Sequence, residues 1–104
     1  NMANVYEIVE KARKTGKIEK GSNEATKAAE RGTAKLIVYA ADVDPKQIVL
    51  HLPIICKEKN IHCVEADSKQ KLGLAAGLSV GCAAVAVITA GDAEKDLIAF
   101  KAKK

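Results

Sequence analysis

Two apolar runs constrain the fold of this chain of 104 residues more than any other feature of its sequence. Residues 35–41 (KLIVYAA) and 83–89 (AAVAVIT) are apolar almost throughout and lack the alternation of a half-buried strand. Such runs are typical of central strands that are covered on both faces. We therefore predict an α/β fold in which helices pack on both sides of a sheet.

Helical and strand patterns alternate along the rest of the chain. Shorter strands over residues 17–20 and 61–66 bring the expected number of strands to four. The strand–helix–strand order favours mostly parallel pairing. The absence of a long linker indicates a single domain over residues 1–104. Helices are predicted over residues 5–15, 22–31, 44–52 (capped by Asp44 and interrupted by Pro53), 53–59, 68–76 and from residue 92 onward.

The composition is that of a mildly basic chain, with 17 Lys+Arg against 13 Asp+Glu and a net charge of +4. This balance is compatible with a nucleic-acid partner without requiring one. No apolar run approaches the ~20 residues that a membrane span needs, and the chain does not start like a secretion signal. The three cysteines form no CxxC pair, which favours small buried residues in a cytoplasmic protein.

No segment of the sequence has the pattern of a catalytic site. The chain contains neither a GxGxxG nor a P-loop motif. His51 and His62 have no evident nucleophile or carboxylate partner, and the cysteines and histidines lack the spacing of metal ligands. We therefore predict a binding protein rather than an enzyme, with no cofactor and no metal.

Residues 22–31 (SNEATKAAER) form the most informative predicted helix. At about 100° per residue, Asn23, Lys27 and Arg31 share one face, and the alanines occupy the opposite one. One interpretation is a solvated surface with a Glu24–Lys27 ion pair and Asn23 as the helix cap. The other is recognition of a nucleic acid, because Asn, Glu and Lys side chains can contact base edges and the preceding glycine permits a close approach of phosphate.

The segment KGSNEATKAAERG (residues 20–32) closely resembles the signature of the kink-turn-binding ribosomal protein family, in particular its archaeal large-subunit members. Five blocks match in order and at compatible spacing over nearly the whole chain. The resemblance implies a three-layer α-β-α sandwich around a four-stranded mixed sheet. The four further blocks are AADVDP (40–45), HLP (51–53), SKQ (68–70) and GLSV (77–80).

The resemblance also implies an RNA site. Members of this family bind kink-turns, in which a bulge and sheared G·A pairs bend a duplex sharply. The major groove of an RNA duplex is normally too narrow for side chains, and a kink opens it. Transferred to this chain, the residues implied to contact the G·A pairs and the RNA beside them are Lys20, Gly21, Asn23, Glu24, Lys27 and Arg31.

Three further segments complete the implied site. Ile48 matches an apolar residue that packs against an extruded nucleotide, and Asp44 matches an acidic residue beside it; the alternatives are a core position and a helix cap. Lys69 matches a phosphate-facing lysine; the alternative is an ordinary exposed residue of the first helical turn. Some family members have Arg-Pro at positions 80–81, where this chain has Val-Gly, which favours the archaeal type. The loop implied to lie over the bulge, with exposed apolar side chains, contains Leu78, Ser79 and Val80.

The implied ligands are 23S ribosomal RNA and the box C/D and H/ACA guide RNAs. The chain would be the assembly platform for guide-particle proteins that methylate or pseudouridylate RNA, and some relatives also join ribonuclease P. The alternatives are a protein-interaction module or a ribosomal relative that binds a different RNA site. A protein partner would use a surface on which Leu52, Ile54 and Ile55 are partly exposed. No membrane partner is expected.

Overall fold

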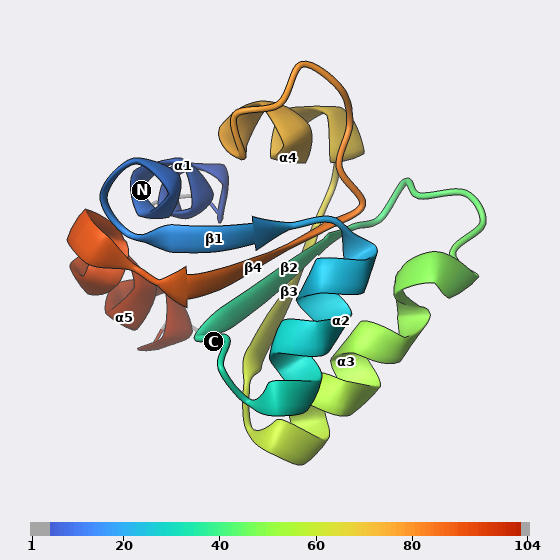
Figure 1. Ribbon diagram of the computed structural model, residues 1–104, viewed down its shortest axis with the longest axis horizontal. Helices are drawn as coiled ribbons and strands as arrows, with labels where there is room; N and C mark the ends of the chain where they lie inside the picture. Colours follow the sequence, from blue (N-terminus) through green and yellow to red (C-terminus); the bar gives the residue numbers. More distant parts are fainter. Residues whose placement is uncertain (1–4, 103–104) are drawn as a thin grey trace.

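The computed structural model describes residues 5–102, with the side chains of residues 5–99. Helices and strands alternate along this part of the chain (Figure 1). Each predicted strand is present to within one residue of its predicted ends. The elements are α1 (Val5–Thr15), β1 (Lys17–Lys20), α2 (Ser22–Arg31), β2 (Leu36–Ala40), α3 (Gln47–Lys59), β3 (His62–Ala66), α4 (Lys69–Ala75), β4 (Ala84–Thr89), the short 3-10 helix η1 (Gly91–Ala93) and α5 (Glu94–Ala102).

The four strands form one mixed sheet in the order β1-β4-β2-β3. β2 and β3 are parallel, whereas β4 is antiparallel to both of its neighbours. The family resemblance implied this mixed sheet, and the prediction of mostly parallel pairing was wrong. The reason is the length of α4: seven residues rise only about 10 Å, which is too short to return the chain along a strand. β4 therefore begins at the end of the sheet where β3 finishes.

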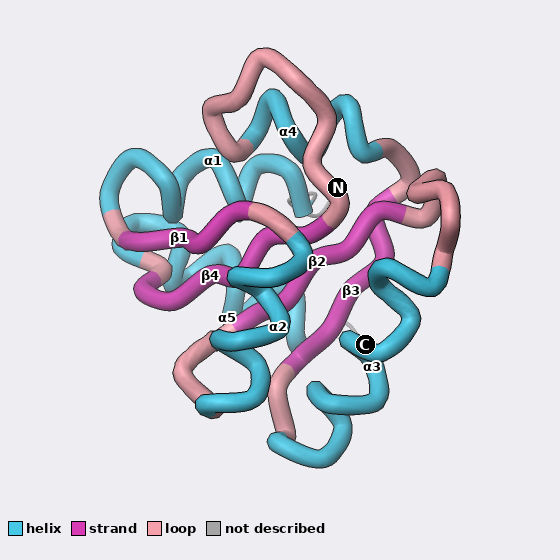
Figure 2. Tube along the Cα trace, turned by 45° about the vertical axis from the view of Figure 1, so that its right-hand side comes forward, coloured by secondary structure: helices cyan, strands magenta, loops and turns pink. Residues whose placement is uncertain are grey.

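Helices cover both faces of the sheet, as the apolar runs predicted. α2 and α3 pack side by side on one face, and α1 and α4 lie on the other (Figures 1 and 2). α5 lies beside α1, where Lys11 Nζ is 2.6 Å from Asp96 Oδ2. The result is a three-layer α-β-α sandwich. Between residues 5 and 102, no helix combines the length and apolar character needed to cross a membrane.

The core lies around the two central strands. Leu36, Ile37 and Val38 of β2 and residues 84–87 of β4 are completely buried, which confirms the interpretation of the apolar runs. The alanines of α2 face this core, and their small side chains let the helix backbone approach the sheet. The three cysteines are free thiols, two of them buried. A hydrogen bond with Cys56 and burial raise the pKa of Cys63, which stays protonated near neutral pH.

The start of α3 differs from the prediction. The helix begins at Gln47, and no side-chain cap precedes it in the described chain. Its first amides donate to main-chain carbonyls, Ile48 N to Pro45 O (3.2 Å) and Val49 N to Lys46 O (3.0 Å). Asp44 is therefore not the cap of this helix.

Pro53 lies inside α3 and does not divide it. A proline removes one amide donor but keeps a helical φ, so a helix can continue through it when packing holds both halves. Val49, Leu52 and Cys56 are buried on either side of Pro53 and supply that packing. The prediction of two separate helices was wrong for this reason.

Candidate nucleic-acid interface

The sheet topology collects the predicted site segments at one end of the molecule. β1, β2 and β3 run in one direction and β4 runs against them, with Lys20 beside Val85 and Ala40 beside Ala66. The segments after β1, β2 and β3 and the segment before β4 therefore meet at the same end of the sheet (Figure 1). These segments contain residues 20–24, 42–48, 68–70 and 77–81, which are distant in sequence and adjacent in the fold.

The start of α2 presents its first turn to the outside. Gly21 is the N-cap residue and has φ 102°, a conformation that favours glycine, and its amide donates to Ala84 O at 2.8 Å. No side chain in the described part of the chain caps this helix. Asn23 is thus not the cap; it is an exposed residue of the first turn. Capping is therefore not the reason for an asparagine at this position.

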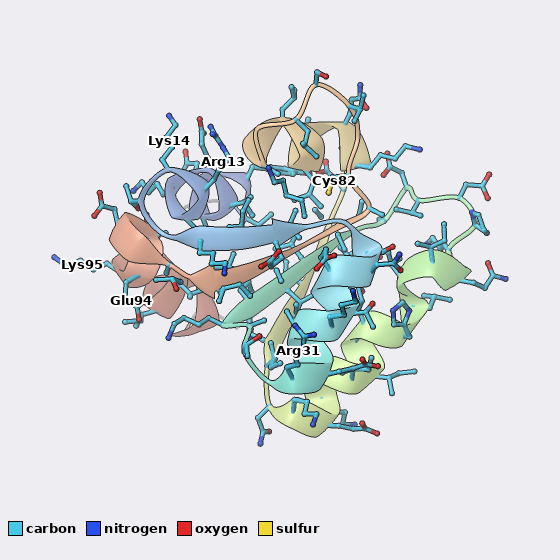
Figure 3. The ribbon with its side chains drawn as sticks, viewed as in Figure 1. Arg13, Lys14, Arg31, Cys82, Glu94 and Lys95 are labelled. Carbon is cyan, nitrogen blue, oxygen red and sulfur yellow. The ribbon has the colours of Figure 1, made fainter. Side chains whose placement is uncertain are left out.

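Glu24 and Lys27 lie exposed on the outer face of α2. Glu24 Oε2 is 4.0 Å from Lys27 Nζ, and about half of each side chain is accessible. An ion pair this exposed contributes little to stability. Glu24 and Lys27 can therefore release each other and bind a ligand with little loss of stability. Arg31 lies at the other end of α2 (Figure 3), away from the end of the sheet where the other residues meet.

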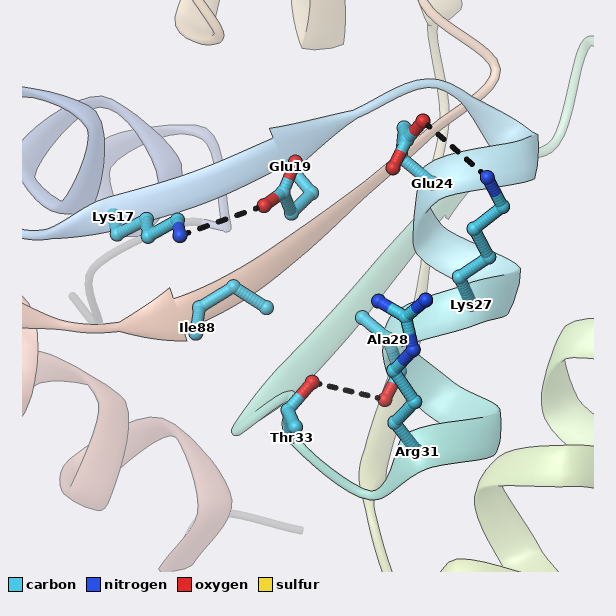
Figure 4. A pocket seen from close by; sticks show the side chains of 8 residues that line it. All are labelled: Lys17, Glu19, Glu24, Lys27, Ala28, Arg31, Thr33 and Ile88. Carbon is cyan, nitrogen blue, oxygen red and sulfur yellow. Dashed lines mark hydrogen bonds and ion pairs between the residues drawn. The ribbon is translucent and has the colours of Figure 1, made fainter.

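A shallow groove runs beside this face of α2 (Figure 4). It has a volume of about 220 Å³ and lies between α2, β1 and β4. Positive and negative side chains both line the groove. Lys17 is paired with Glu19 at 3.8 Å, and Lys27 is paired with Glu24. The residues that line it are Lys17, Glu19, Glu24, Lys27, Ala28, Arg31, Thr33 and Ile88.

Asp44 and Ile48 lie in the segment that joins β2 to α3. The carboxylate-bearing residue Asp44 is exposed. Ile48 is 39% exposed although it is apolar, so it is not the core residue that the alternative interpretation required. An exposed isoleucine at the first turn of a helix can pack against a flat partner such as a base.

Lys69 is fixed at the first turn of α4. The Ser68 side chain caps this helix by accepting from Lys71 N (3.2 Å), and the Lys69 amide donates to Asp42 Oδ1 at 2.8 Å. The Lys69 side chain itself is exposed. Asp42 thereby joins the β2–α3 segment to α4. The sequence analysis did not single out Asp42, although it stands inside one of the five matching blocks.

The loop over residues 77–81 packs closely on α4. Leu78 N donates to Gly73 O at 2.8 Å, and a Cβ added at Gly73 would lie 2.0 Å from Val80 O. Val80 is 63% exposed, as predicted, and Ser79 is also exposed. Leu78 is half-buried and packs against the core, so the prediction that it is exposed was wrong. It is one of the apolar contacts that hold the loop on the domain.

A hydrogen-bonded cluster joins α1 to the start of α4. The Tyr6 hydroxyl donates to the Asp67 carboxylate and accepts from Ser68 N at 3.1 Å. Burial and this bond to the carboxylate raise the pKa of Tyr6, while the same bond lowers the pKa of Asp67. Asp67 is thus ionised at neutral pH. The segment that leads to Lys69 is held by Tyr6 of α1 and, through the Lys69 amide, by Asp42.

Taken together, these features define a class of protein: a three-layer α/β domain that gathers an uncapped helix start, exposed cations and an apolar loop on one surface. Residues 5–102 contain no cluster of side chains that could hold a metal ion. A model of the ribosomal protein L7Ae/L30e/S12e/Gadd45 family matches residues 3–97, and the chain belongs to this family.

Among solved structures, the chain is similar to the Giardia lamblia 15.5kD RNA binding protein. The two share 32% sequence identity and superpose with a TM-score of 0.89. The alignment covers 98% of this chain and 90% of that chain. The likeness therefore extends over nearly the whole of both chains.

Proposed function

We propose that this chain binds kink-turn RNA through the end of the sheet where α2 begins. The observation that carries the proposal is the exposed first turn of α2, where Asn23 and Glu24 stand on an uncapped helix start above Gly21. Lys69 and the 77–81 loop flank this turn. A carboxylate and an amide can read the base edges of sheared G·A pairs, and the free amides and lysines favour phosphate. The 15.5kD relative is described as an RNA binding protein, which supports the proposal.

Within the family, we propose that the chain acts as the archaeal large-subunit ribosomal protein L7Ae. Its ligands would be kink-turns of 23S ribosomal RNA and of box C/D and H/ACA guide RNAs in the cytoplasm. The chain would stabilise the bend, and partner proteins of the guide particles would perform the chemistry. Reconstitution of each particle with and without this chain tests these assignments, because a guide RNA that recruits its other proteins equally well without it would contradict them.

The direct test compares two RNAs in a gel-shift titration. One is a kink-turn, and the other is the same RNA with its sheared G·A pairs replaced by Watson–Crick pairs. We expect tight binding to the first and only weak, salt-sensitive binding to the second. Equal binding to both RNAs would contradict the proposal.

Substitution of Glu24 separates base recognition from phosphate attraction. Glu24→Ala removes a group expected to accept hydrogen bonds from bases, so kink-turn affinity should fall about tenfold or more. Binding to the unkinked RNA should not change. Glu30→Ala, at the exposed far end of the same helix, is the matched control and should leave both affinities unchanged. An equal loss on both RNAs for Glu24→Ala would count against base recognition.

A second candidate function, a docking surface for a protein, is favoured by the outer side of α3. Leu50 and Ile54 are 52% and 64% exposed, one turn apart on this helix. Ile55 is half-buried, and Leu52, which was expected on this surface, is completely buried. If this surface acts alone, a protein partner should be captured without RNA and equally well by the Lys27→Ala variant.

A further inference from the structure

Two short hydrogen bonds join α2 to α3 through one threonine. Thr26 Oγ1 lies 2.6 Å from His51 Nε2 and 2.6 Å from the main-chain oxygen of Ser22. Thr26 and His51 are both half-buried between the two helices. Ser22 is the first residue of α2, so this chain of bonds ends in the turn that presents Asn23 and Glu24.

The chemistry of the hydroxyl group fixes the direction of both bonds. A threonine hydroxyl has a single hydrogen, and a carbonyl oxygen can only accept. The hydrogen of Thr26 is therefore donated to Ser22 O, and Thr26 must accept from the imidazole. His51 thus carries a hydrogen on Nε2, and the bonds run from His51 to Thr26 to Ser22.

The first turn of α3 needs such a contact from outside. It has no side-chain cap in the described chain, and its first amides, those of Ile48, Val49 and Leu50, reach back only to the main-chain oxygens of Pro45 and Lys46. Pro53 has no amide hydrogen to donate to the carbonyl of Val49. The turn that carries Ile48 is therefore held by fewer main-chain bonds than the middle of a regular helix.

We infer that His51 and Thr26 are positioning residues for RNA recognition. Their bonds hold the first turn of α2, through Ser22 O, and the second turn of α3, three residues after Ile48, at a fixed spacing, so that Glu24 and Ile48 meet a single bent RNA at the same time. The inference rests on the proposed kink-turn function and adds two residues that need not touch RNA. A kinked RNA would contact α2 and α3 together, so its binding depends on the spacing of the two helices. A straight duplex would contact only exposed lysine side chains, so its binding does not.

The chain contains a matched control for this contact. Thr15 Oγ1 donates to Lys11 O at 2.7 Å and accepts from Asp92 N at 2.8 Å. Thr15 therefore repeats the arrangement of Thr26. Each threonine hydroxyl donates to the main-chain oxygen four residues earlier and accepts a hydrogen bond from a residue in another element. Thr15 precedes β1 and lies at the opposite end of the sheet from the interface.

The experiment measures RNA affinity and melting temperature for Thr26→Val, Thr26→Ser, Thr15→Val and the unchanged chain. Valine keeps the shape and removes the hydroxyl, so both Thr26→Val and Thr15→Val should lower the melting temperature, Thr26→Val by more because Thr26 is half-buried and Thr15 is exposed. Only Thr26→Val should weaken kink-turn binding, by about tenfold, without changing binding to the unkinked RNA. Thr26→Ser restores the hydroxyl and should recover the affinity to within about twofold of the unchanged chain.

His51→Leu provides a second route to the same result. It removes the donor, leaves the Thr26 to Ser22 bond in place, and should reproduce the loss of kink-turn affinity. If Thr26→Val does not fold, this variant decides the question. A long-range proton–nitrogen spectrum of the unchanged chain should show a hydrogen on Nε2 of His51, and a hydrogen on Nδ1 alone would overturn the inference.

The outcomes separate this inference from the proposed function. If the unchanged chain binds kinked and unkinked RNA equally, the proposed function fails and this inference with it. If the unchanged chain discriminates but Thr26→Val and His51→Leu bind the kink-turn as well as Thr15→Val does, only the inference is overturned.

Discussion

At the scale of single residues, Gly73 decides where the 77–81 loop lies. The main-chain oxygen of Val80 occupies the position that a Cβ at residue 73 would need, at a separation of 2.0 Å. The neighbouring backbone of Gly81 would be 3.1 Å away. Neither can move without displacing the loop, because both contacts are with backbone. The absence of a side chain at residue 73 is therefore a condition for the exposed position of Val80 on the proposed interface.

Gly73→Ala should therefore displace the loop and destabilise the domain. Overpacking of this kind costs about 1–3 kcal/mol, measurable as a lower melting temperature, and kink-turn affinity should fall with it. Gly81→Ala is the graded control for melting temperature alone, because the atoms nearest its Cβ would belong to the flexible side chains of Gln70 and Lys69, at 3.1 and 3.2 Å. A larger effect of Gly81→Ala than of Gly73→Ala would contradict this account.

The residues that the sequence analysis missed have partners far away in the chain. Asp42 bonds an amide 27 positions later, and Thr26 bonds an imidazole 25 positions later. Periodicity describes which face of one helix a residue occupies and contains no information on such pairings. Leu78 was misplaced for the same reason, since a leucine among glycines is exposed or buried according to where its loop folds back. The buried and exposed faces of α2 were predictable because they depend on the periodicity of a single element.

At the scale of elements, the Tyr6–Asp67 bond connects α1 to the segment before α4. It couples two helices on the same face of the sheet, and it lies at the base of the turn that carries Lys69. Asp42 holds that turn from the opposite side through the Lys69 amide. The start of α4 is thus positioned by two other segments of the chain, α1 and the β2–α3 segment, as well as by its own short helix.

This bond makes stability depend on pH in the acid range. The pKa of Asp67 is lowered in the folded chain from its usual value of 3.8. A lowered pKa adds stability that is present above the usual value and lost as the pH falls through the folded value. Tyr6→Phe removes the donor, so its melting temperature should fall less steeply than that of the unchanged chain between about pH 5 and about pH 2.

Tyr39→Phe is the matched control for this prediction. Tyr39 is also half-buried, but its pKa is raised by burial and by the charge of Glu65, without a bond to a carboxylate. The melting temperature of Tyr39→Phe should therefore fall with decreasing pH as steeply as that of the unchanged chain. If Tyr6→Phe and Tyr39→Phe give the same profile, the Tyr6–Asp67 bond does not govern the acid behaviour.

Element types were predictable from the sequence, and their connections were less so. Each of the four strands was located from composition and periodicity, whereas the direction of β4 depends on the return path through α4. The continuity of α3 through Pro53 depends on burial of Val49 and Leu52 against the sheet. In both cases tertiary packing overrode a local signal that is correct for an isolated segment.

At the scale of the whole molecule, function depends on where the charge lies rather than on its sum. The net charge of +4 is small for a nucleic-acid-binding domain. The ends of β1, β2 and β3 bring Lys20, Lys46 and Lys69 to one end of the sheet, and all three are exposed. The exposed carboxylates of Glu24, Asp42 and Asp44 lie in the same segments, so each lysine attracts phosphate at its own position rather than through a net excess of charge at this end.

The salt dependence of RNA binding tests this distribution of charge. Each lysine that neutralises a phosphate releases a counterion, so Lys69→Gln should reduce the slope of log affinity against log salt by about one on the kink-turn. It should also weaken binding to the unkinked RNA, unlike Glu24→Ala. Lys59→Gln removes the same charge from the exposed end of α3, at the opposite end of the sheet, and should leave the slope unchanged. Equal slopes for Lys69→Gln and Lys59→Gln would mean that only net charge matters. That result would contradict the proposal that RNA binds at the end of the sheet where α2 begins.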